Sequence, residues 1–239
     1  GLLCCMACAP ENLPKEAFVH VEGEYLVEPD GDTLFIKGTN LGNWLNPEGY
    51  MFGFQKTNSA GMIDRMFCEL VGPDFTAGFW KLFKDNYVTR EDIRFIARTG
   101  ANTIRVPFHY KLFTDEDYMG LKADQDGFRR LDDVIGWCRE SGLYVILDMH
   151  DAPGGQTGDN IDDSYGYPWL FESEASQQLM CDIWRKIADY YKNEPVILGY
   201  DLMNEPIAPY FENMEELNSK LEPLYKRVVK AVREVDTNH

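Results

Sequence analysis

The sequence is poor in basic residues and has no long apolar run. Its 239 residues contain 23 Lys and Arg against 40 Asp and Glu, a formal net charge of -17. A surface with this much negative charge repels phosphate backbones and anionic membranes. We therefore expect no nucleic acid partner. No stretch reaches the roughly 18 apolar residues that a membrane-spanning helix needs, so we expect no such span. The 44% hydrophobic content is that of a globular protein with a sizeable core.

Three of the six cysteines are scattered singly along the chain and lack the spacing of a metal site. Cys4, Cys5 and Cys8 lie within GLLCCMACAP, which looks like the end of a secretory leader with its small-residue cleavage pattern. We therefore interpret residues 1–10 as the remnant of a leader, with Cys8 as a candidate lipid-bearing residue. The expected location is secreted, periplasmic or that of a surface lipoprotein. An apolar tail of other origin fits residues 1–10 nearly as well. The scattered cysteines are expected to be buried, and they are Cys68, Cys138 and Cys181.

Apolar runs of strand length alternate with helical patterns along the chain. The predicted strands at 101–106, 143–147 and 196–202 are near-continuously apolar, and 37–41 is a weaker candidate for a first strand. The predicted helices show apolar residues at helical spacing and cover 89–99, 128–141, 179–191 and 217–232. Thr89 opens a capping-box pattern, and Gly100 and Gly142 are expected to end two of the helices. Before this alternation, a β-hairpin is predicted from 25–27 and 33–36 around the turn sequence PDGD.

This alternation predicts a parallel α/β domain, either an open doubly wound sheet or a barrel. No Gly-x-Gly-x-x-Gly motif follows a strand, and polar residues cluster just after the strands, which favours a (β/α)8 TIM barrel. Only four of the eight strands are found. We therefore expect 24–239 to be the N-terminal part of a barrel domain, comprising the first four β/α units.

Three predicted strand ends carry polar residues, and barrel active sites lie at such ends. They are Arg105, His109 and Tyr110, then Asp148, His150 and Asp151, and finally Asn204 and Glu205. Arg105 lies in an apolar strand and must pair with a carboxylate, with Glu205 or an acid missing from this sequence as the expected partner. His150 is expected to be functional. For His109, a place in the site wall and a packing role remain equally open.

The end of the fourth strand is the most informative segment. Pro206 restricts the preceding residue to an extended conformation and is expected to end the strand at Glu205. Asn204 and Glu205 would face opposite sides of a regular strand, so the backbone must turn out of the sheet if both serve one site. Asp201 would lie about 13 Å lower on such a strand, and we expect it to be a buried, hydrogen-bonded carboxylate.

Asp148, His150, Asp151, His109 and Glu205 could instead form a divalent metal site. The absence of a His-x-His pair after the first strand and of a lysine on the fourth weighs against it, and we expect no metal and no organic cofactor. Eight loop aromatics suit sugar faces, and we expect about three to line a cleft. They are Trp44, Tyr50, Phe52, Phe54, Tyr165, Tyr167, Trp169 and Phe171.

Four segments, in this order, resemble glycoside hydrolase family 5, the cellulase-type retaining hydrolases with a (β/α)8 barrel. They are GTNLGNWL at 38–45, IRVPFHY at 104–110, LDMHDAPGGQTGDN at 147–160 and GYDLMNEP at 199–206. The resemblance implies that Glu205 is the acid/base, that Asn204 binds the sugar 2-hydroxyl, and that Arg105 and His150 shape the catalytic subsite. It also implies a nucleophilic Glu at the end of a seventh strand, which this sequence does not contain. Asp201 would be too far from Glu205 to replace it, because a retaining pair is about 5 to 5.5 Å apart.

The candidate substrate-binding residues are Trp44, His109, Tyr110, Asp159 and Asn160. The segments WLNPEGYMF and APGGQTGDN are most similar to exo-β-1,3-glucanase-like members. We therefore expect hydrolysis of β-glucan by double displacement in the full-length protein, with an oligo- or polysaccharide as partner. A β-mannanase, a glycolipid hydrolase and a non-catalytic sugar-binding barrel are the alternatives. The linkage, exo or endo action and the oligomeric state stay open.

Overall fold

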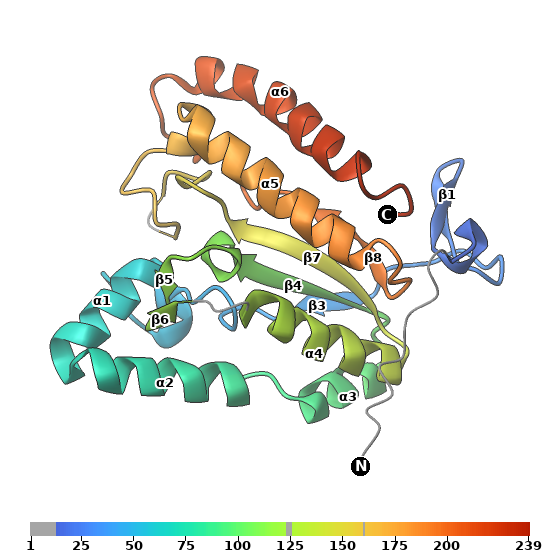
Figure 1. The fold of residues 1–239 in the computed structure, drawn as a ribbon, viewed down its shortest axis with the longest axis horizontal. Helices are drawn as coiled ribbons and strands as arrows, with labels where there is room; N and C mark the ends of the chain where they lie inside the picture. Colours follow the sequence, from blue (N-terminus) through green and yellow to red (C-terminus); the bar gives the residue numbers. More distant parts are fainter. Residues whose placement is uncertain (1–12, 123–125, 160) are drawn as a thin grey trace, which may run out of the picture.

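A computed structural model describes residues 13–122, 126–159 and 161–239, and its centre is a four-stranded parallel sheet (Figure 1). The strands are β3 (Gly38–Asn40), β4 (Thr103–His109), β7 (Tyr144–Asp151) and β8 (Ile197–Asp201), paired in chain order. A doubly wound sheet requires a reversal of strand order, which this sheet lacks. Consecutive parallel strands linked by helices are instead the arrangement of a TIM-type barrel, so the predicted α/β class is confirmed.

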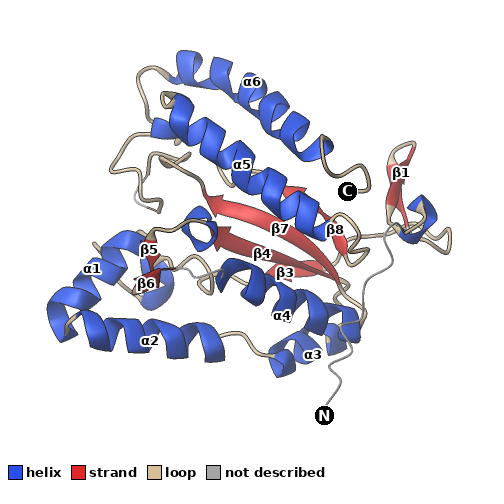
Figure 2. Cartoon of the chain, viewed as in Figure 1, coloured by secondary structure: helices blue, strands red, loops and turns tan. Residues whose placement is uncertain are grey.

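Six α-helices connect and cover these strands in the described part of the chain (Figure 2). They are α1 (Ala60–Val71), α2 (Pro73–Asn86), α3 (Arg90–Arg98), α4 (Asp126–Ser141), α5 (Glu174–Tyr191) and α6 (Met214–Arg233). In Figure 1 the strands run between the pair α3 and α4 and the pair α5 and α6. The short elements are η1 (Lys15–Ala17), η2 (Gly49–Phe52), η3 (Tyr110–Phe113), η4 (Trp169–Phe171), β1 (His20–Glu22), β2 (Tyr25–Val27), β5 (Asp117–Tyr118) and β6 (Leu121–Lys122).

The predicted helix signals are present in the structure. The Thr89 backbone N–H donates to Asp92 Oδ2 at 2.8 Å, so the capping box at the start of α3 is confirmed. Gly100 and Gly142 follow α3 and α4 with φ of +89° and +69°, the left-handed backbone that suits glycine at a helix end.

The N-terminal strands pair differently from the prediction. β2 pairs with β1, whereas Thr33 contributes only an isolated bridge to Val27. Gly23, with φ of +63°, allows the tight turn that brings β1 back onto β2. The predicted leader remnant at 1–10 lies outside the described residues.

The helices α1 and α2 were not predicted from the sequence. Ser59 caps α1, and Pro73 occupies the first position of α2 directly after Gly72. Aromatic rings pack between the two helices, with Phe67 of α1 at 5.0 Å from Phe79 and 5.5 Å from Trp80 of α2 between centroids. This aromatic packing stabilises a helical pair between β3 and α3.

Alternation along the strands separates the core from the opposite face of the sheet. Ile104, Val106 and Phe108 of β4 are fully buried, as are Val145, Leu147 and Met149 of β7. Because side chains alternate with a period of two, Arg105, Asp148 and His150 project from the other face. The same pleating that buries the core therefore gathers polar groups on one face of the sheet.

Within the described ranges, no helix combines the length and apolarity needed to cross a bilayer. Cys138 and Cys181 are buried as predicted, Cys68 is half-buried, and all three are free thiols.

Candidate active site

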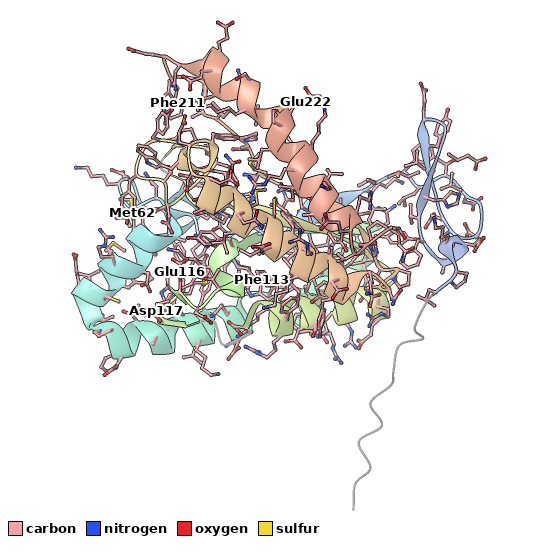
Figure 3. All side chains as sticks on the ribbon, turned by 45° about the horizontal axis from the view of Figure 1, so that its top comes forward. Met62, Phe113, Glu116, Asp117, Phe211 and Glu222 are labelled. Atoms are coloured by element: carbon pink, nitrogen blue, oxygen red, sulfur yellow. The ribbon has the colours of Figure 1, made fainter. Side chains whose placement is uncertain are left out.

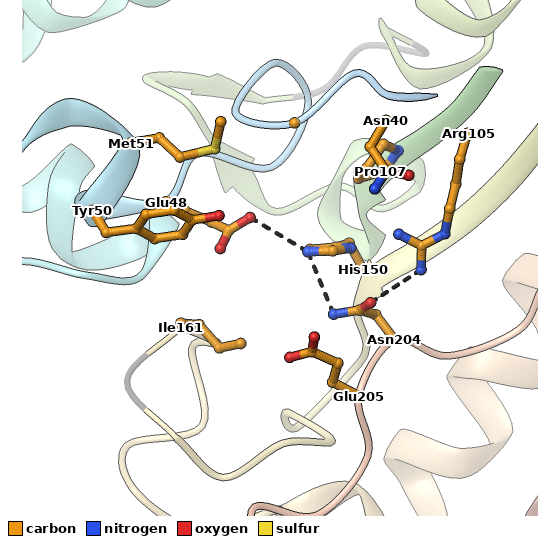
Figure 4. A pocket seen from close by; sticks show the side chains of 11 residues that line it. Asn40, Glu48, Tyr50, Met51, Arg105, Pro107, His150, Ile161, Asn204 and Glu205 are labelled. Atoms are coloured by element: carbon orange, nitrogen blue, oxygen red, sulfur yellow. Dashed lines mark hydrogen bonds and ion pairs between the residues drawn. The ribbon is translucent and has the colours of Figure 1, made fainter. Parts of the chain in front are cut away.

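A pocket of about 430 Å³ lies at the carboxyl ends of the parallel strands (Figure 4). Arg105 comes from β4, His150 from β7, and Asn204 and Glu205 from the segment after β8. The structure therefore brings the four predicted catalytic residues to one place. The remaining lining residues are Asn40, Gly42, Glu48, Tyr50, Met51, Pro107 and Ile161.

Glu205 occupies a turn and not a strand end. β8 stops at Asp201, and Glu205 has φ of +39°, so the predicted extended strand up to Pro206 is wrong. Hydrogen bonds from the neighbouring loop hold the turn: Thr157 Oγ1 donates to the Glu205 carbonyl and Gln156 Nε2 to the Asn204 carbonyl, both at 2.9 Å. The backbone thus leaves the sheet early, and both Asn204 and Glu205 reach the pocket.

Arg105 pairs with two aspartates, so the expectation that Glu205 is its partner is wrong. Its Nη1 lies 3.0 Å from Asp148 Oδ2, and its Nε and Nη2 donate to Asp201 Oδ2 at 3.0 and 2.7 Å. Nη2 also donates to Asn204 Oδ1 at 3.0 Å. Asp201 is hydrogen-bonded as predicted, but its side chain is 39% exposed because it is the last residue of β8.

His150 is held between two carboxylates. Its Nδ1 lies 2.7 Å from Asp148 Oδ2, and its Nε2 lies 3.4 Å from Glu48 Oε1. Burial lowers the pKa of His150, but the hydrogen bonds to Asp148 and Glu48 outweigh it and raise the pKa to about 9. At neutral pH the ring is therefore an imidazolium. Burial also raises the pKa of Asp148, against the effect of His150.

Glu48 was not singled out from the sequence. Only 7% of it is exposed, and it lines the pocket beside Tyr50. An acid in the aromatic segment WLNPEGYMF, directly after the first strand of the sheet, is the signal that could have revealed it. Its carboxylate adds an acceptor to the wall of the pocket that faces Asn204 and Glu205 in Figure 4.

His109 belongs to a second, buried cluster and does not line the pocket. A register shift between β4 and β7 pairs His109 with Asp151 and skips His150. His109 Nε2 lies 3.0 Å from Asp151 Oδ2 and 3.2 Å from Asp163 Oδ2, and the side chain is fully buried. The shift therefore turns His109 away from the substrate side, and its expected substrate contact is wrong.

The five residues of the candidate metal site are divided between the pocket and the buried His109 cluster. Ligand atoms of His109, Asp151 and Asp163 all lie within 4.8 Å of one another, as a metal would require. However, the Lys111 backbone N–H donates to His109 Nδ1 at 3.1 Å, so the ring proton sits on Nε2 and points at the carboxylates. A metal at Nε2 would force that proton onto Nδ1, against the Lys111 donor. This geometry favours a hydrogen-bonded cluster over a metal site.

The other predicted binding residues are dispersed. Trp44 is fully buried and donates to the Lys84 carbonyl at 2.9 Å, so its predicted substrate contact is wrong. Tyr110 lines a separate cavity beside Asp151, and Asp159 lines a further groove. Asn160 lies outside the described residues. Among the eight loop aromatics, Tyr50 lines the main pocket and Tyr165 the two neighbouring ones, whereas Phe52, Phe54 and Tyr167 pack against the core.

Comparison with known proteins links this geometry to glycoside hydrolases. Beta-xylosidase of Phanerodontia chrysosporium is 32% identical over 224 residues, covering 93% of this chain and 45% of that protein. Endoglucanase C of Acetivibrio thermocellus is 33% identical over 159 residues, covering 66% and 43%. Glucan 1,3-beta-glucosidase I/II of Saccharomyces cerevisiae is 30% identical over 207 residues, covering 80% and 45%. The chain thus spans less than half the length of these relatives.

Solved structures support the same fold. Rutinosidase from Aspergillus niger superposes with a TM-score of 0.69 at 19% identity, covering 84% of this chain and 60% of that one. An endogalactoceramidase gives a TM-score of 0.60 at 18% identity, covering 91% and 50%. The family model described as cellulase (glycosyl hydrolase family 5) matches residues 68–239. The chain therefore belongs to glycoside hydrolase family 5.

Proposed function

We propose that the protein hydrolyses O-glycosidic bonds in β-glucan by a retaining double displacement, with Glu205 as the acid/base. The observation that carries the proposal is the convergence of Arg105, His150, Asn204 and Glu205 on one pocket at the ends of consecutive parallel strands. Barrel enzymes place their catalytic groups at this position. Relatives named as an endoglucanase and a glucan 1,3-beta-glucosidase support a glucan as the substrate.

Glu205 performs the proton transfers in this proposal. Its side chain stands at the open side of the pocket, where it can protonate the leaving oxygen and later deprotonate water. Asn204 is buried, Arg105 donates to its Oδ1, and its Nδ2 lies 3.4 Å from His150 Nε2. The second N–H of this amide can donate to the sugar 2-hydroxyl.

His150 and Glu48 bind the sugar whose anomeric carbon reacts. The imidazolium and the buried carboxylate supply a donor and an acceptor 3.4 Å apart on one wall of the pocket. Hydroxyl groups of a pyranose match such alternating donors and acceptors. We therefore assign these two residues to recognition and not to proton transfer.

A retaining mechanism needs a second carboxylate about 5 to 5.5 Å from Glu205. The matched relatives extend well beyond the aligned segment, and we assign the nucleophile to that further part of the protein.

The test uses the complete gene product and the Glu205→Gln and Glu205→Ala variants on β-1,3- and β-1,4-glucans. Loss of acid/base catalysis should lower kcat by about 10² to 10⁴. An aryl β-glucoside with a good leaving group needs no acid in the first step, so the glycosyl-enzyme of Glu205→Ala should accumulate. Added azide should attack it in place of water and release a β-glucosyl azide with retained configuration.

Glu222→Gln is the control, because Glu222 projects from α6 in Figure 3 and its side chain is 77% exposed. The acid/base assignment is wrong if Glu205→Gln stays within tenfold of the unmodified protein, and the retaining mechanism is wrong if the azide product is the α-anomer. Binding of glucans without any cleavage would support the non-catalytic alternative.

A further inference from the structure

Gln156 is a fully buried polar side chain next to the pocket. It follows Gly154 and Gly155, whose φ of +82° and +75° are left-handed. A Cβ on Gly155 would lie only 2.3 Å from the Ser164 Cβ, so both the backbone and the close approach require glycine here. Gln156 is not among the residues that line the pocket, so it acts on a bound ligand only through other residues.

The Gln156 amide joins the end of β7 to the turn that carries Glu205. Its Nε2 donates to the His150 carbonyl at 2.8 Å and to the Asn204 carbonyl at 2.9 Å. Its Oε1 accepts the Ala152 backbone N–H at 2.9 Å. A flipped amide would turn its oxygen towards two carbonyls, so these partners define the orientation of the side chain. The amide therefore serves as a bridge with every polar atom in use.

The bridge lies where the sheet no longer connects the two segments. β8 ends at Asp201, and after it the Asn204 N–H donates to the Met149 carbonyl at 3.2 Å. A parallel ladder fixes the spacing of two strands by regular backbone bonds. Beyond Asp201, the side chain of Gln156 takes the place of such bonds between β7 and the turn.

The two bridged residues also meet on the pocket side. His150 Nε2 and Asn204 Nδ2 lie 3.4 Å apart there (Figure 4), and Gln156 bonds the backbone carbonyls of the same two residues. His150 belongs to the sugar-binding wall, and Asn204 directly precedes the proposed acid. The spacing between the wall and the acid is thus held both by the side chains and by the backbone.

We propose that Gln156 is a positioning residue that sets the distance between the bound sugar and the Glu205 carboxyl, an assignment that rests on the proposed function. A general acid must lie within hydrogen-bond reach of the oxygen that it protonates. A small displacement of the turn would therefore slow the cleavage of substrates that need the proton. A good leaving group departs without it and is affected less.

The experiment compares kcat/KM of the complete gene product on phenyl β-glucoside, which has a poor leaving group, and on dinitrophenyl β-glucoside, which has a good one. Gln156→Met keeps the length of the side chain without its polar atoms. Gln156→Glu keeps the acceptor for the Ala152 N–H, loses both donors, and serves alone if the Met variant does not fold. Each should lower the value for the phenyl glucoside by about 10- to 100-fold and that for the dinitrophenyl glucoside by a clearly smaller factor.

Gln178→Met is the matched control, because Gln178 is exposed on α5 and its Nε2 donates to Asp182 at 2.9 Å. It should leave both values unchanged. If the Gln156 variants lower both values by the same factor, or lower neither, Gln156 does not position the acid, and the proposal is overturned while the function stands.

Amide hydrogen exchange on the same variants needs no catalysis and separates this inference from the proposed function. The Ile207 and Ala208 N–H groups donate to the carbonyls of Gln156 and Thr157 at 2.8 Å, so a looser turn should exchange faster at both positions in Gln156→Met than in Gln178→Met. Faster exchange in a protein that cleaves no glycoside would support the bridge while the proposed function fails. Unchanged exchange in such a protein would overturn both.

Discussion

Arg105 Nη1 lies 3.0 Å from Oδ2 of Asp148, a carboxylate with no exposed surface. Within the described part of the chain Asp148 Oδ1 has no hydrogen-bond partner, so the contacts that oppose the cost of burying this charge, from Arg105 and His150, both fall on Oδ2. The same guanidinium fixes Asn204 in the pocket. One side chain therefore links the stability of the sheet to the geometry of the site.

Replacing Arg105 with Met should destabilise the fold by about 3 kcal/mol, because it leaves a buried carboxylate with one partner fewer. Arg105→Lys should lower the free energy of unfolding by a smaller amount, since lysine keeps the charge but not the forked geometry of the guanidinium. Urea unfolding at pH 7 measures both. Arg185→Met, whose partners Asp182 and Glu234 are half-exposed, should change the free energy of unfolding by less than about 1 kcal/mol. If Arg105→Met and Arg185→Met lower the free energy of unfolding equally, Arg105 does not stabilise the buried charge of Asp148.

The raised pKa of His150 predicts a loss of stability in alkali. An ordinary histidine titrates near 6.5, so an imidazolium with a pKa of about 9 contributes its full stabilisation below about pH 6.5 and loses it as the pH rises through 9. The shift corresponds to about 3 kcal/mol. The difference in unfolding free energy between the unmodified protein and His150→Gln should therefore shrink by roughly this amount between pH 6 and pH 10. His109 is present in both proteins, so its own titration does not contribute to this difference. Parallel pH profiles would show that His150 is not stabilised as a cation.

Thr157→Val removes the hydroxyl that donates to the Glu205 carbonyl and keeps the shape of the side chain. Glu205 holds an unfavourable positive φ, so a looser turn should misplace its carboxyl and lower kcat by about tenfold, with little change in KM. The stability loss should be only about 1 kcal/mol. Thr99→Val is the control, because the Thr99 hydroxyl also donates to a carbonyl, that of Ile96, in an exposed position. A fall in kcat for both variants would exclude a local effect on Glu205.

Asp163→Asn should loosen the contact between the 152–168 segment and α1. Burial opposes ionisation, but the hydrogen bond from His109 holds the pKa of Asp163 below its ordinary value. Its contribution is therefore present above about pH 4 and is lost as the pH falls. At pH 7 the variant should lose about 1 to 3 kcal/mol and show faster amide exchange at Gly61. Asp133→Asn, on a half-exposed side chain of α4, should leave Gly61 unchanged. Unchanged exchange at Gly61 in Asp163→Asn would contradict the role.

Local patterns in the sequence predicted most of the repeating framework. Apolar patterns located β4, β7, β8 and α3 to α6, because burial against neighbouring elements is what these patterns encode. β3 was only a weaker candidate, since its residues GTN are not apolar. The capping residue Thr89 and the glycines after α3 and α4 were predicted from backbone chemistry alone. In α2, Phe75, Phe79 and Phe83 follow one another at helical spacing, but no helix was predicted for α1 or α2.

The site was predictable in part for a related reason. Strand ends of a barrel converge, so Arg105, His150, Asn204 and Glu205 could be expected to meet. The burial of His109 beside Asp151 depends on the register between β4 and β7, and the partner of Arg105 depends on where β8 ends. Both are long-range properties that no segment of sequence encodes by itself.

The segment 156–157 is bonded to the chain around Glu205 at four points: through Gln156 Nε2, through Thr157 Oγ1, and through the Ile207 and Ala208 backbone N–H groups. The loop that walls the pocket and the turn that carries the acid are thus one unit. A substitution that displaces one should therefore displace the other. An engineer who grafts a substrate loop from a relative into this scaffold should transplant residues 152–168 together with 204–208.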